Sequence, residues 1–142
     1  MEIIQLNKVS DEVMSAFERL IPQLTLNSEI PSREDITEII KAKNSYIFLA
    51  KEEEIYGILT LIICKIPTGK KACIEDVVVD EKIRGKGIGR LLVNHAIQFA
   101  KENGIAKIEL TSRPLRVGAN VLYQKMGFEL RDTNVYRFPV EK

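Results

Sequence analysis

The sequence predicts a mixed α/β fold, in which helices pack on the faces of a central sheet. Three observations indicate it: strand-like and helix-like stretches alternate, a central run of strands is antiparallel, and a helix then joins two strands that can lie parallel. A chain of 142 residues supports a single core, so we expect one domain over residues 1–142. Its 45% hydrophobic and 29% charged residues are typical of a soluble globular protein.

Apolar residues at helical spacing predict four helices, over residues 10–21, 31–40, 87–102 and 115–126. Ser10 is the expected N-cap of the first helix, and Pro22 should end or bend it. In the second helix, Ser32 and Asp35 fit the S-x-x-D capping pattern. The first two helices therefore have local start or stop signals in addition to their periodicity.

Strand-like stretches occupy residues 2–6, 46–50, 55–66, 72–79, 107–111, 128–131 and 134–140. With the helices, they give the order β-α-α-β-β-β-α-β-α-β-β. The strands over 46–50, 55–66 and 72–79 are expected to form an antiparallel meander. The crossover helix after it favours a parallel neighbour for the strand over 72–79.

Charge and apolar patterning exclude several classes of function. A net charge of +1 provides no basic surface for nucleic acid. The first residues lack a signal-peptide pattern, and the longest apolar run, residues 58–66, is too short to cross a bilayer. We therefore expect a soluble, cytoplasmic protein with no nucleic-acid or membrane partner.

The cysteines and the single histidine do not form a metal-binding pattern. Without a Cys-x-x-Cys pair, we expect no metal. Cys64 and Cys73 are expected to be buried free thiols, although their spacing would also allow a disulfide across a hairpin. His95 falls on the apolar stripe of its helix, so we expect it to have a structural role.

The most informative motif joins the strand over 72–79 to the helix over 87–102: Arg84-Gly85-Lys86-Gly87-Ile88-Gly89. Glycines let the backbone turn sharply and approach a ligand closely, and the unpaired N–H groups of a helix start attract anions. Arg84, Lys86 and Arg90 add positive charge. The segment therefore predicts a site for a phosphate or pyrophosphate.

The spacing excludes two well-known phosphate loops. A P-loop needs Gly-x-x-x-x-Gly-Lys-Ser/Thr, and the residues after Gly87 supply neither that spacing nor the metal-binding hydroxyl. A dinucleotide fingerprint needs Gly-x-Gly-x-x-Gly, but the third residue after Gly87 is Arg90. What remains is Arg-x-x-Gly-x-Gly after a valine-rich strand.

This motif resembles the acyl-CoA-binding motif of the GCN5-related N-acetyltransferase (GNAT) family. The resemblance spans nearly the whole chain and is most specific over residues 74–92 and 119–128. It implies the GNAT fold, a mixed and mostly antiparallel sheet of six to seven strands flanked by about four helices, with one parallel pair splayed apart. It also implies one N-acetyltransferase domain that uses acetyl-CoA as co-substrate, and homodimers are common in the family.

The resemblance assigns residues to the coenzyme. The expected coenzyme-binding residues are Val77, Val78, Val79, Arg84, Gly85, Lys86, Gly87, Ile88, Gly89, Arg90, Arg116 and Asn120. The loop would hold the pyrophosphate, and the valines would pair through their backbones with the pantetheine arm. Asn120 departs from the family spacing, since the position four residues before Ala119 holds Leu115 and Arg116 stands next to it. Arg113 and Arg116 would contact either coenzyme phosphates or an acidic group of the acceptor.

Acetyl transfer to an amine needs a base, because an alkyl amine with a pKa of about 10.4 is almost fully protonated at pH 7. Glu75 is the expected base, directly or through a water chain, and Asp76 is the alternative. Strand alternation would place these two carboxylates on opposite faces. Tyr123 is the expected acid that protonates the leaving thiolate.

The predicted function is acetyl-CoA-dependent N-acetylation of a primary amine on a small molecule or peptide, by direct attack in a ternary complex. The alternatives are a non-catalytic acyl-CoA sensor on the same fold and a nucleotide-binding regulator. In this fold the acceptor is chosen by the first two helices, the loop over 24–29 and a final hairpin with Tyr136 and Arg137, which contain no recognisable signature.

Overall fold

The computed structural model describes residues 1–25 and 29–141. These residues divide into two compact units, Met1–Thr111 and Ser112–Lys142. The elements of the first unit are β1 (Glu2–Gln5), α1 (Asp11–Leu24), α2 (Arg33–Lys41), β2 (Ser45–Lys51), β3 (Ile55–Ile66), β4 (Gly69–Val79), the 3-10 helix η1 (Glu81–Ile83), α3 (Ile88–Glu102) and β5 (Lys107–Glu109). The second unit contains α4 (Val117–Lys125). The single domain expected from chain length stays a prediction.

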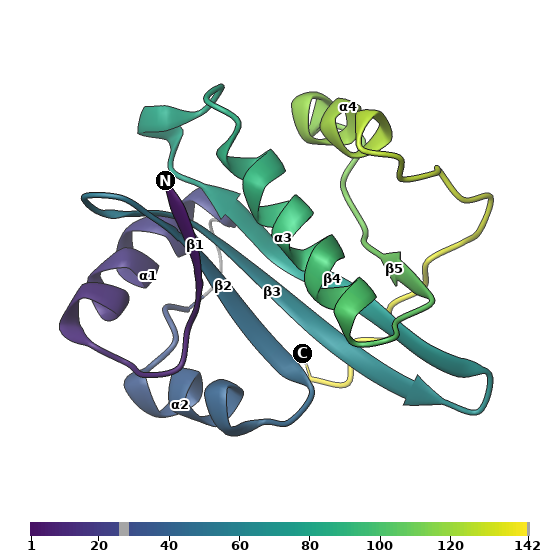
Figure 1. The fold of residues 1–142 in the computed structure, drawn as a ribbon, viewed down its shortest axis with the longest axis horizontal. Coiled ribbons are helices and arrows are strands. Elements are labelled where there is room, and N and C mark those ends of the chain that lie inside the picture. Colours follow the sequence, from purple (N-terminus) through teal and green to yellow (C-terminus); the bar gives the residue numbers. More distant parts are fainter. Residues whose placement is uncertain (26–28, 142) are drawn as a thin grey trace. The chain divides into compact units, whose positions relative to one another are not determined.

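The sheet of the first unit has the order β1-β2-β3-β4-β5, which follows the order along the chain (Figure 1). The pairs β1–β2, β2–β3 and β3–β4 are antiparallel, and β4–β5 is parallel. The predicted mixed, mostly antiparallel sheet is therefore confirmed. The parallel pair arises because α3 carries the chain back along the sheet between β4 and β5.

The number of strands differs from the prediction. The described residues form five strands rather than six to seven, because the stretches over 128–131 and 134–140 form no strand. Alternation of apolar residues makes a stretch competent to pair, but a strand also needs a partner with free backbone groups. The predicted final hairpin with Tyr136 and Arg137 is therefore wrong for this structure.

The helix signals read from the sequence are mostly confirmed. The Ser10 side chain accepts a hydrogen bond from the backbone N–H of Val13, and Ser32 and Asp35 form a reciprocal capping box at α2. Pro22 does not end α1 at once, because the helix continues to Leu24. A proline two residues before the end removes a single helical hydrogen bond, which the last turn tolerates. No described helix is long and apolar enough to cross a membrane.

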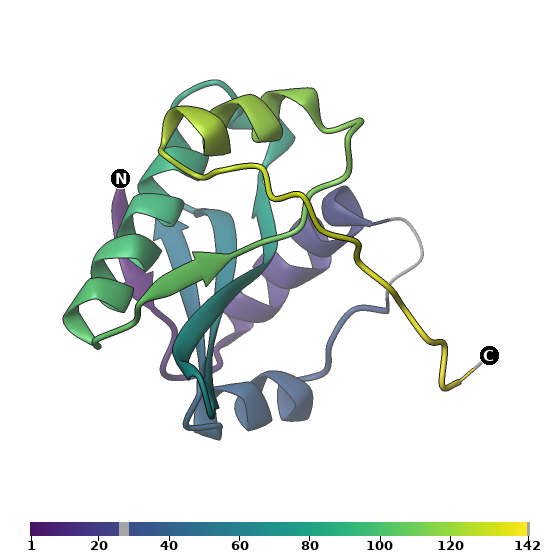
Figure 2. The ribbon, with the colours of Figure 1, turned by 90° about the vertical axis from the view of Figure 1, so that its right-hand side faces the viewer.

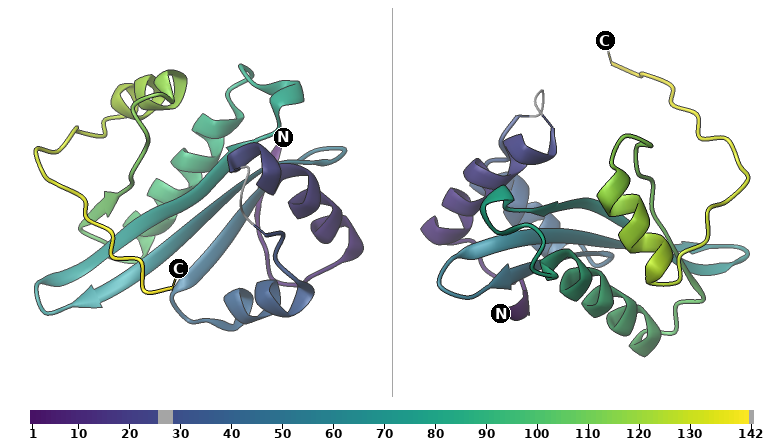
Figure 3. Two further views of the ribbon diagram at one scale, coloured as in Figure 1. Left: turned by 180° about the vertical axis from the view of Figure 1, so that it is seen from behind. Right: turned by 90° about the horizontal axis from the view of Figure 1, so that it is seen from above.

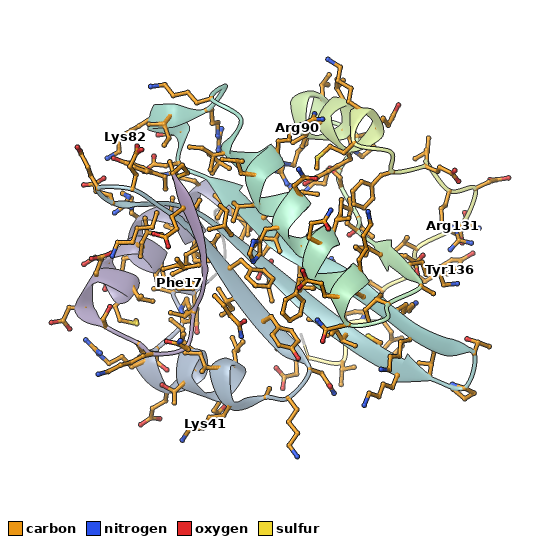
Figure 4. All side chains as sticks on the ribbon, viewed as in Figure 1. Phe17, Lys41, Lys82, Arg90, Arg131 and Tyr136 are labelled. Carbon is orange, nitrogen blue, oxygen red and sulfur yellow. The ribbon has the colours of Figure 1, made fainter. Side chains whose placement is uncertain are left out.

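The helices of the first unit cover both faces of the sheet. α1 and α2 lie on one face and α3 lies on the other (Figures 2 and 3). On the α1 face, Phe17 packs in a core with Ile58 and Val78 (Figure 4). On the α3 face, Phe48 packs edge-on against His95, with ring centroids 4.7 Å apart. His95 thus has the structural surroundings expected for it.

The middle of β4 contains a β-bulge. Ile58 lies opposite Val78, but Thr60 lies opposite Glu75, so β4 has one more residue than β3 between these pairs. Asp76, within this interval, has a φ of 51°, in the left-handed region. The regular alternation expected for Glu75 and Asp76 is therefore interrupted, and both side chains are exposed.

Candidate functional site

The parallel ladder between β4 and β5 is short. Its last pair is Cys73 with Glu109, while β4 continues to Val79. Over residues 74–79, no other described strand pairs with this side of β4. β4 therefore presents backbone N–H and C=O groups along an open edge, where an extended ligand could bind by hydrogen bonds.

The three valines at the end of β4 are not equivalent. The side chain of Val78 is 2% exposed and belongs to the core, so only its backbone is available to a ligand. Val77 and Val79 are half-buried. The carbonyl of Val79 accepts a hydrogen bond from Arg84 Nε at 3.2 Å, which ties the loop back to the end of the strand.

The glycine loop follows η1 and ends in an unusual helix start. Gly85 and Gly87 have φ values of 83° and 79°, which residues with a Cβ rarely adopt. Gly87 is the N-cap of α3, and no described side chain caps this helix. The first helical bond runs from the Leu91 N–H to the Gly87 carbonyl, so the N–H groups before Leu91 lack helical partners.

Positive charge surrounds this helix start. Arg84, Lys86 and Arg90 are exposed, and Arg90 lies in the first turn of α3 (Figure 4). The ion pairs found among the described residues do not involve any of the three. α3 also has no acidic residue in its first turn. The site therefore combines free N–H donors, the positive end of a helix dipole and basic side chains, as an anion requires.

Asp80 is a buried carboxylate that the sequence interpretation did not single out. It follows β4 and its side chain caps η1, accepting from the Lys82 N–H at 3.2 Å. Arg19 and Gln23 of α1 also donate to it. Burial by itself raises the pKa of Asp80, but these hydrogen bonds outweigh it and hold the pKa below its usual value. An aspartate directly before a tight turn is a recognisable cap, but its α1 partners become visible only in the fold.

The two candidate bases, Glu75 and Asp76, are both exposed but differ in backbone conformation. Glu75 lies opposite Thr60 in the ladder, and Asp76 occupies the bulge. Cys73, two residues before Glu75, and Cys64 are free thiols as expected, but both are half-buried rather than buried. Burial and the neighbouring Cys64 raise the pKa of Cys73.

In the second unit, α4 carries the candidate acid. Tyr123 is 7% exposed, and its ring packs against Phe128 with centroids 5.8 Å apart. Burial raises the pKa of Tyr123, with Arg116 lowering it to a smaller extent. The hydroxyl therefore keeps its proton at neutral pH.

Asn120 and Arg116 lie at the start of α4. Asn120 Nδ2 donates to the Arg113 carbonyl at 2.9 Å, so part of its amide is used to hold the preceding turn. Arg116 is the exposed N-cap of α4, and Arg113 is also exposed. The buried Ser112 Oγ has no hydrogen-bond partner among the described groups, which marks it as a polar atom that a ligand could satisfy.

The parts of the chain expected to choose an acceptor are only partly described. Residues 26–28 of the loop over 24–29 lie outside the described residues. Arg131 and Tyr136 belong to the C-terminal segment, where the Tyr136 side chain is exposed (Figure 4). Among the described residues, no cluster of three or more histidine, cysteine or acidic side chains could hold a metal ion.

Comparisons of the sequence and of the structure with known proteins both find acetyltransferases. The sequence model of the Acetyltransferase (GNAT) family matches residues 8–128. Human N-acetyltransferase 8B is 30% identical over 108 residues, which cover 71% of this chain and 48% of that protein. This chain spans between about a third and a half of the length of four curated relatives that it matches.

Solved structures share the fold over nearly the full chain. A transcriptional regulator from Bacillus halodurans C-125 superposes with a TM-score of 0.80 and 25% identity, covering 96% of this chain and 99% of that chain. An aminoglycoside N-acetyltransferase in complex with CoA gives a TM-score of 0.81 at 17% identity, covering 96% of this chain and 93% of that chain.

Proposed function

Because the chain belongs to the GNAT acetyltransferase family, we propose that it transfers the acetyl group of acetyl-CoA to a primary amine of a small molecule or peptide. The start of α3 is the observation that carries this proposal. It offers free N–H groups next to Arg84, Lys86 and Arg90, which suit the pyrophosphate of the coenzyme. The basic side chains add charge-assisted hydrogen bonds, which are about twice as strong as neutral ones.

The open edge of β4 suits the pantetheine arm. This arm carries amide groups, which pair with a strand edge as another strand would. Val77 and Val79 lie on the part of β4 that continues past the ladder with β5. The bulge also contributes in this proposal. Its extra residue leaves a backbone N–H unpaired, and this N–H can donate to the oxyanion that forms from the thioester carbonyl.

Acetyl transfer then proceeds by direct attack in a ternary complex. Glu75, directly or through water, removes a proton from the acceptor amine, and Tyr123 gives its proton to the departing thiolate. Tyr123 suits this role because its raised pKa keeps it protonated. A cysteine intermediate is disfavoured, because the raised pKa of Cys73 leaves little reactive thiolate at neutral pH.

Release of free CoA thiol in the presence of an amine panel tests this function. The panel contains an aminoglycoside, a polyamine, a lysine peptide and a peptide with a free N-terminus, so that it samples amines of several kinds. Initial rates that give intersecting double-reciprocal lines would support the ternary complex. Parallel lines would indicate a covalent intermediate and contradict direct attack.

A non-catalytic acyl-CoA sensor is the second candidate. The similarity to a structure described as a transcriptional regulator favours it. A sensor would bind CoA, give no thiol release with any amine, and be unaffected by Tyr123→Phe. ATP competition that does not depend on the pantetheine arm would instead indicate a nucleotide-binding regulator.

A further inference from the structure

We propose that Arg19 and Gln23 of α1 position the glycine loop for its anionic ligand, with Asp80 as the group through which they act. This inference rests on the proposed function, because it concerns the same coenzyme site. None of the three residues lies in the glycine loop itself. They are therefore positioning residues, and we name their joint set of contacts the α1 latch.

Asp80 is the centre of the α1 latch. Its side chain is fully buried and accepts from Arg19 Nε at 3.1 Å, from Gln23 Nε2 at 3.4 Å and from the Lys82 N–H at 3.2 Å. A buried carboxylate must satisfy its lone pairs where it stands, so these donors fix its position. The end of β4 is thereby fixed against α1.

A second set of contacts extends the α1 latch in both directions along the chain. Gln23 Oε1 accepts from the Glu81 N–H at 2.8 Å, in the first residue of η1. Arg19 Nη2 donates to the Ile55 carbonyl at the start of β3, and the Asp80 N–H donates to the Tyr56 carbonyl at 2.8 Å. One helix thus holds the strand before the loop and the turn that leads into it.

Among the described residues, the exposed part of the glycine loop before the buried Ile88 has few other restraints. Gly85, Lys86 and Gly87 are exposed, and an added Cβ at either glycine would meet nothing within 4 Å. The Arg84 contact with the Val79 carbonyl returns to β4, the strand that the α1 latch holds. The path of the exposed loop therefore depends on the placement of η1 at one end, which α1 restrains, and on the buried start of α3 at the other.

Binding of two acetyl donors distinguishes a role in positioning the loop from a role in the stability of the fold. Acetyl-CoA has the pyrophosphate that the loop would hold, whereas acetyl-pantetheine lacks all phosphates. We expect Arg19→Lys and Gln23→Ala each to weaken acetyl-CoA binding by about three- to ten-fold, the value of one hydrogen bond. In both variants the affinity for acetyl-pantetheine should stay within about two-fold of wild type, and so should kcat.

Gln23→Ala is the more informative variant, because it removes the side-chain hydrogen bonds to Asp80 and Glu81, together with a bond to the Arg19 carbonyl, and leaves no unpaired charge in α1. Arg33→Ala serves as the matched control, since it breaks the exposed Arg33–Asp11 ion pair in the same unit and should leave both affinities unchanged. Calorimetric binding and Tm are measured for every variant. Equal loss for both donors, or a lower Tm with unchanged acetyl-CoA affinity, would overturn the positioning role. Failure of the wild type to bind either donor would overturn the proposed function as well.

Discussion

Asp76 shows how one residue can combine local strain with the chemistry next to it. It is the only described non-glycine residue with positive φ, and it lies in the bulge beside Glu75. Asp tolerates the left-handed region better than most residues because its short polar side chain bonds locally. Observed strain of this kind clusters at functional sites, which agrees with the role proposed for Glu75.

Substitutions at Asp76 should follow backbone preference. Asp76→Val should lower the free energy of unfolding by about 1–3 kcal/mol, because a β-branched residue is strained at this φ. Asp76→Gly should stay within about 1 kcal/mol of wild type. Urea denaturation measures both. Glu75→Val, at a neighbouring exposed strand position without positive φ, should change stability by less than about 0.5 kcal/mol. Equal losses for the two valine variants would contradict the strain.

Tyr123 permits a kinetic prediction. Tyr123→Phe should lower kcat by about 100-fold or more, with KM for acetyl-CoA nearly unchanged, because the lost proton is needed only as the thiolate leaves. In the wild type, the raised pKa keeps the Tyr123 hydroxyl protonated, so we expect no loss of kcat from its ionisation up to about pH 10. Steady-state rates between pH 6 and 10 measure both effects. Tyr46→Phe is the control, since its hydroxyl donates to the Lys43 carbonyl and has no part in the proposed reaction.

At the scale of elements, the glycine loop and α3 were predictable and the bulge was not. The loop is marked by local residue choices, since Gly85 and Gly87 supply conformations that other residues avoid. The bulge depends on how β4 aligns with β3, and no residue type between Cys73 and Val79 indicates an extra residue. This bulge interrupts the regular alternation that was assumed for Glu75 and Asp76.

Exchange of glycines tests the loop as an element. Gly87→Ala should lower the free energy of unfolding by about 1–2 kcal/mol, although space is free around the added methyl group, because its φ of 79° is left-handed. Gly118→Ala in α4 has equal space and no positive φ, so it should be neutral or stabilising by up to about 1 kcal/mol. Urea denaturation compares them. If Gly87→Ala were as stable as Gly118→Ala, the loop would not need this backbone conformation.

At the scale of the whole molecule, the order of the strands in the sheet was predictable where neighbouring strands also follow each other along the chain. Hairpin neighbours and a crossover helix determine the order from β2 to β5. The C-terminal stretches fit a strand pattern equally well, yet residues such as Leu130 and Phe138 are 90% and 84% exposed without a ladder to any described strand. Asp80 was missed because its partners come from α1, 61 positions away for Arg19.

Stability toward acid should reflect Asp80. Its pKa is lowered in the folded state, so its charge stabilises the fold above its ordinary value of 3.8 and this contribution is lost as pH falls through the folded pKa. Asp80→Asn should be less stable than wild type at pH 7, but should lose less stability between pH 5 and 2. Thermal unfolding across this range measures the difference. Asp132→Asn, at an exposed position, should give a curve parallel to that of the wild type.

The unpaired edge of β4 also bears on solubility. A long, flat, apolar edge is a template for strands of other molecules and promotes aggregation. Here the edge is interrupted by the bulge and carries the exposed carboxylates of Glu75 and Asp76. Twist and negative charge both oppose the docking of a second sheet, while a single flexible arm with amide groups needs neither a flat edge nor a long one. β4 can therefore remain open to a ligand without recruiting another copy of the protein.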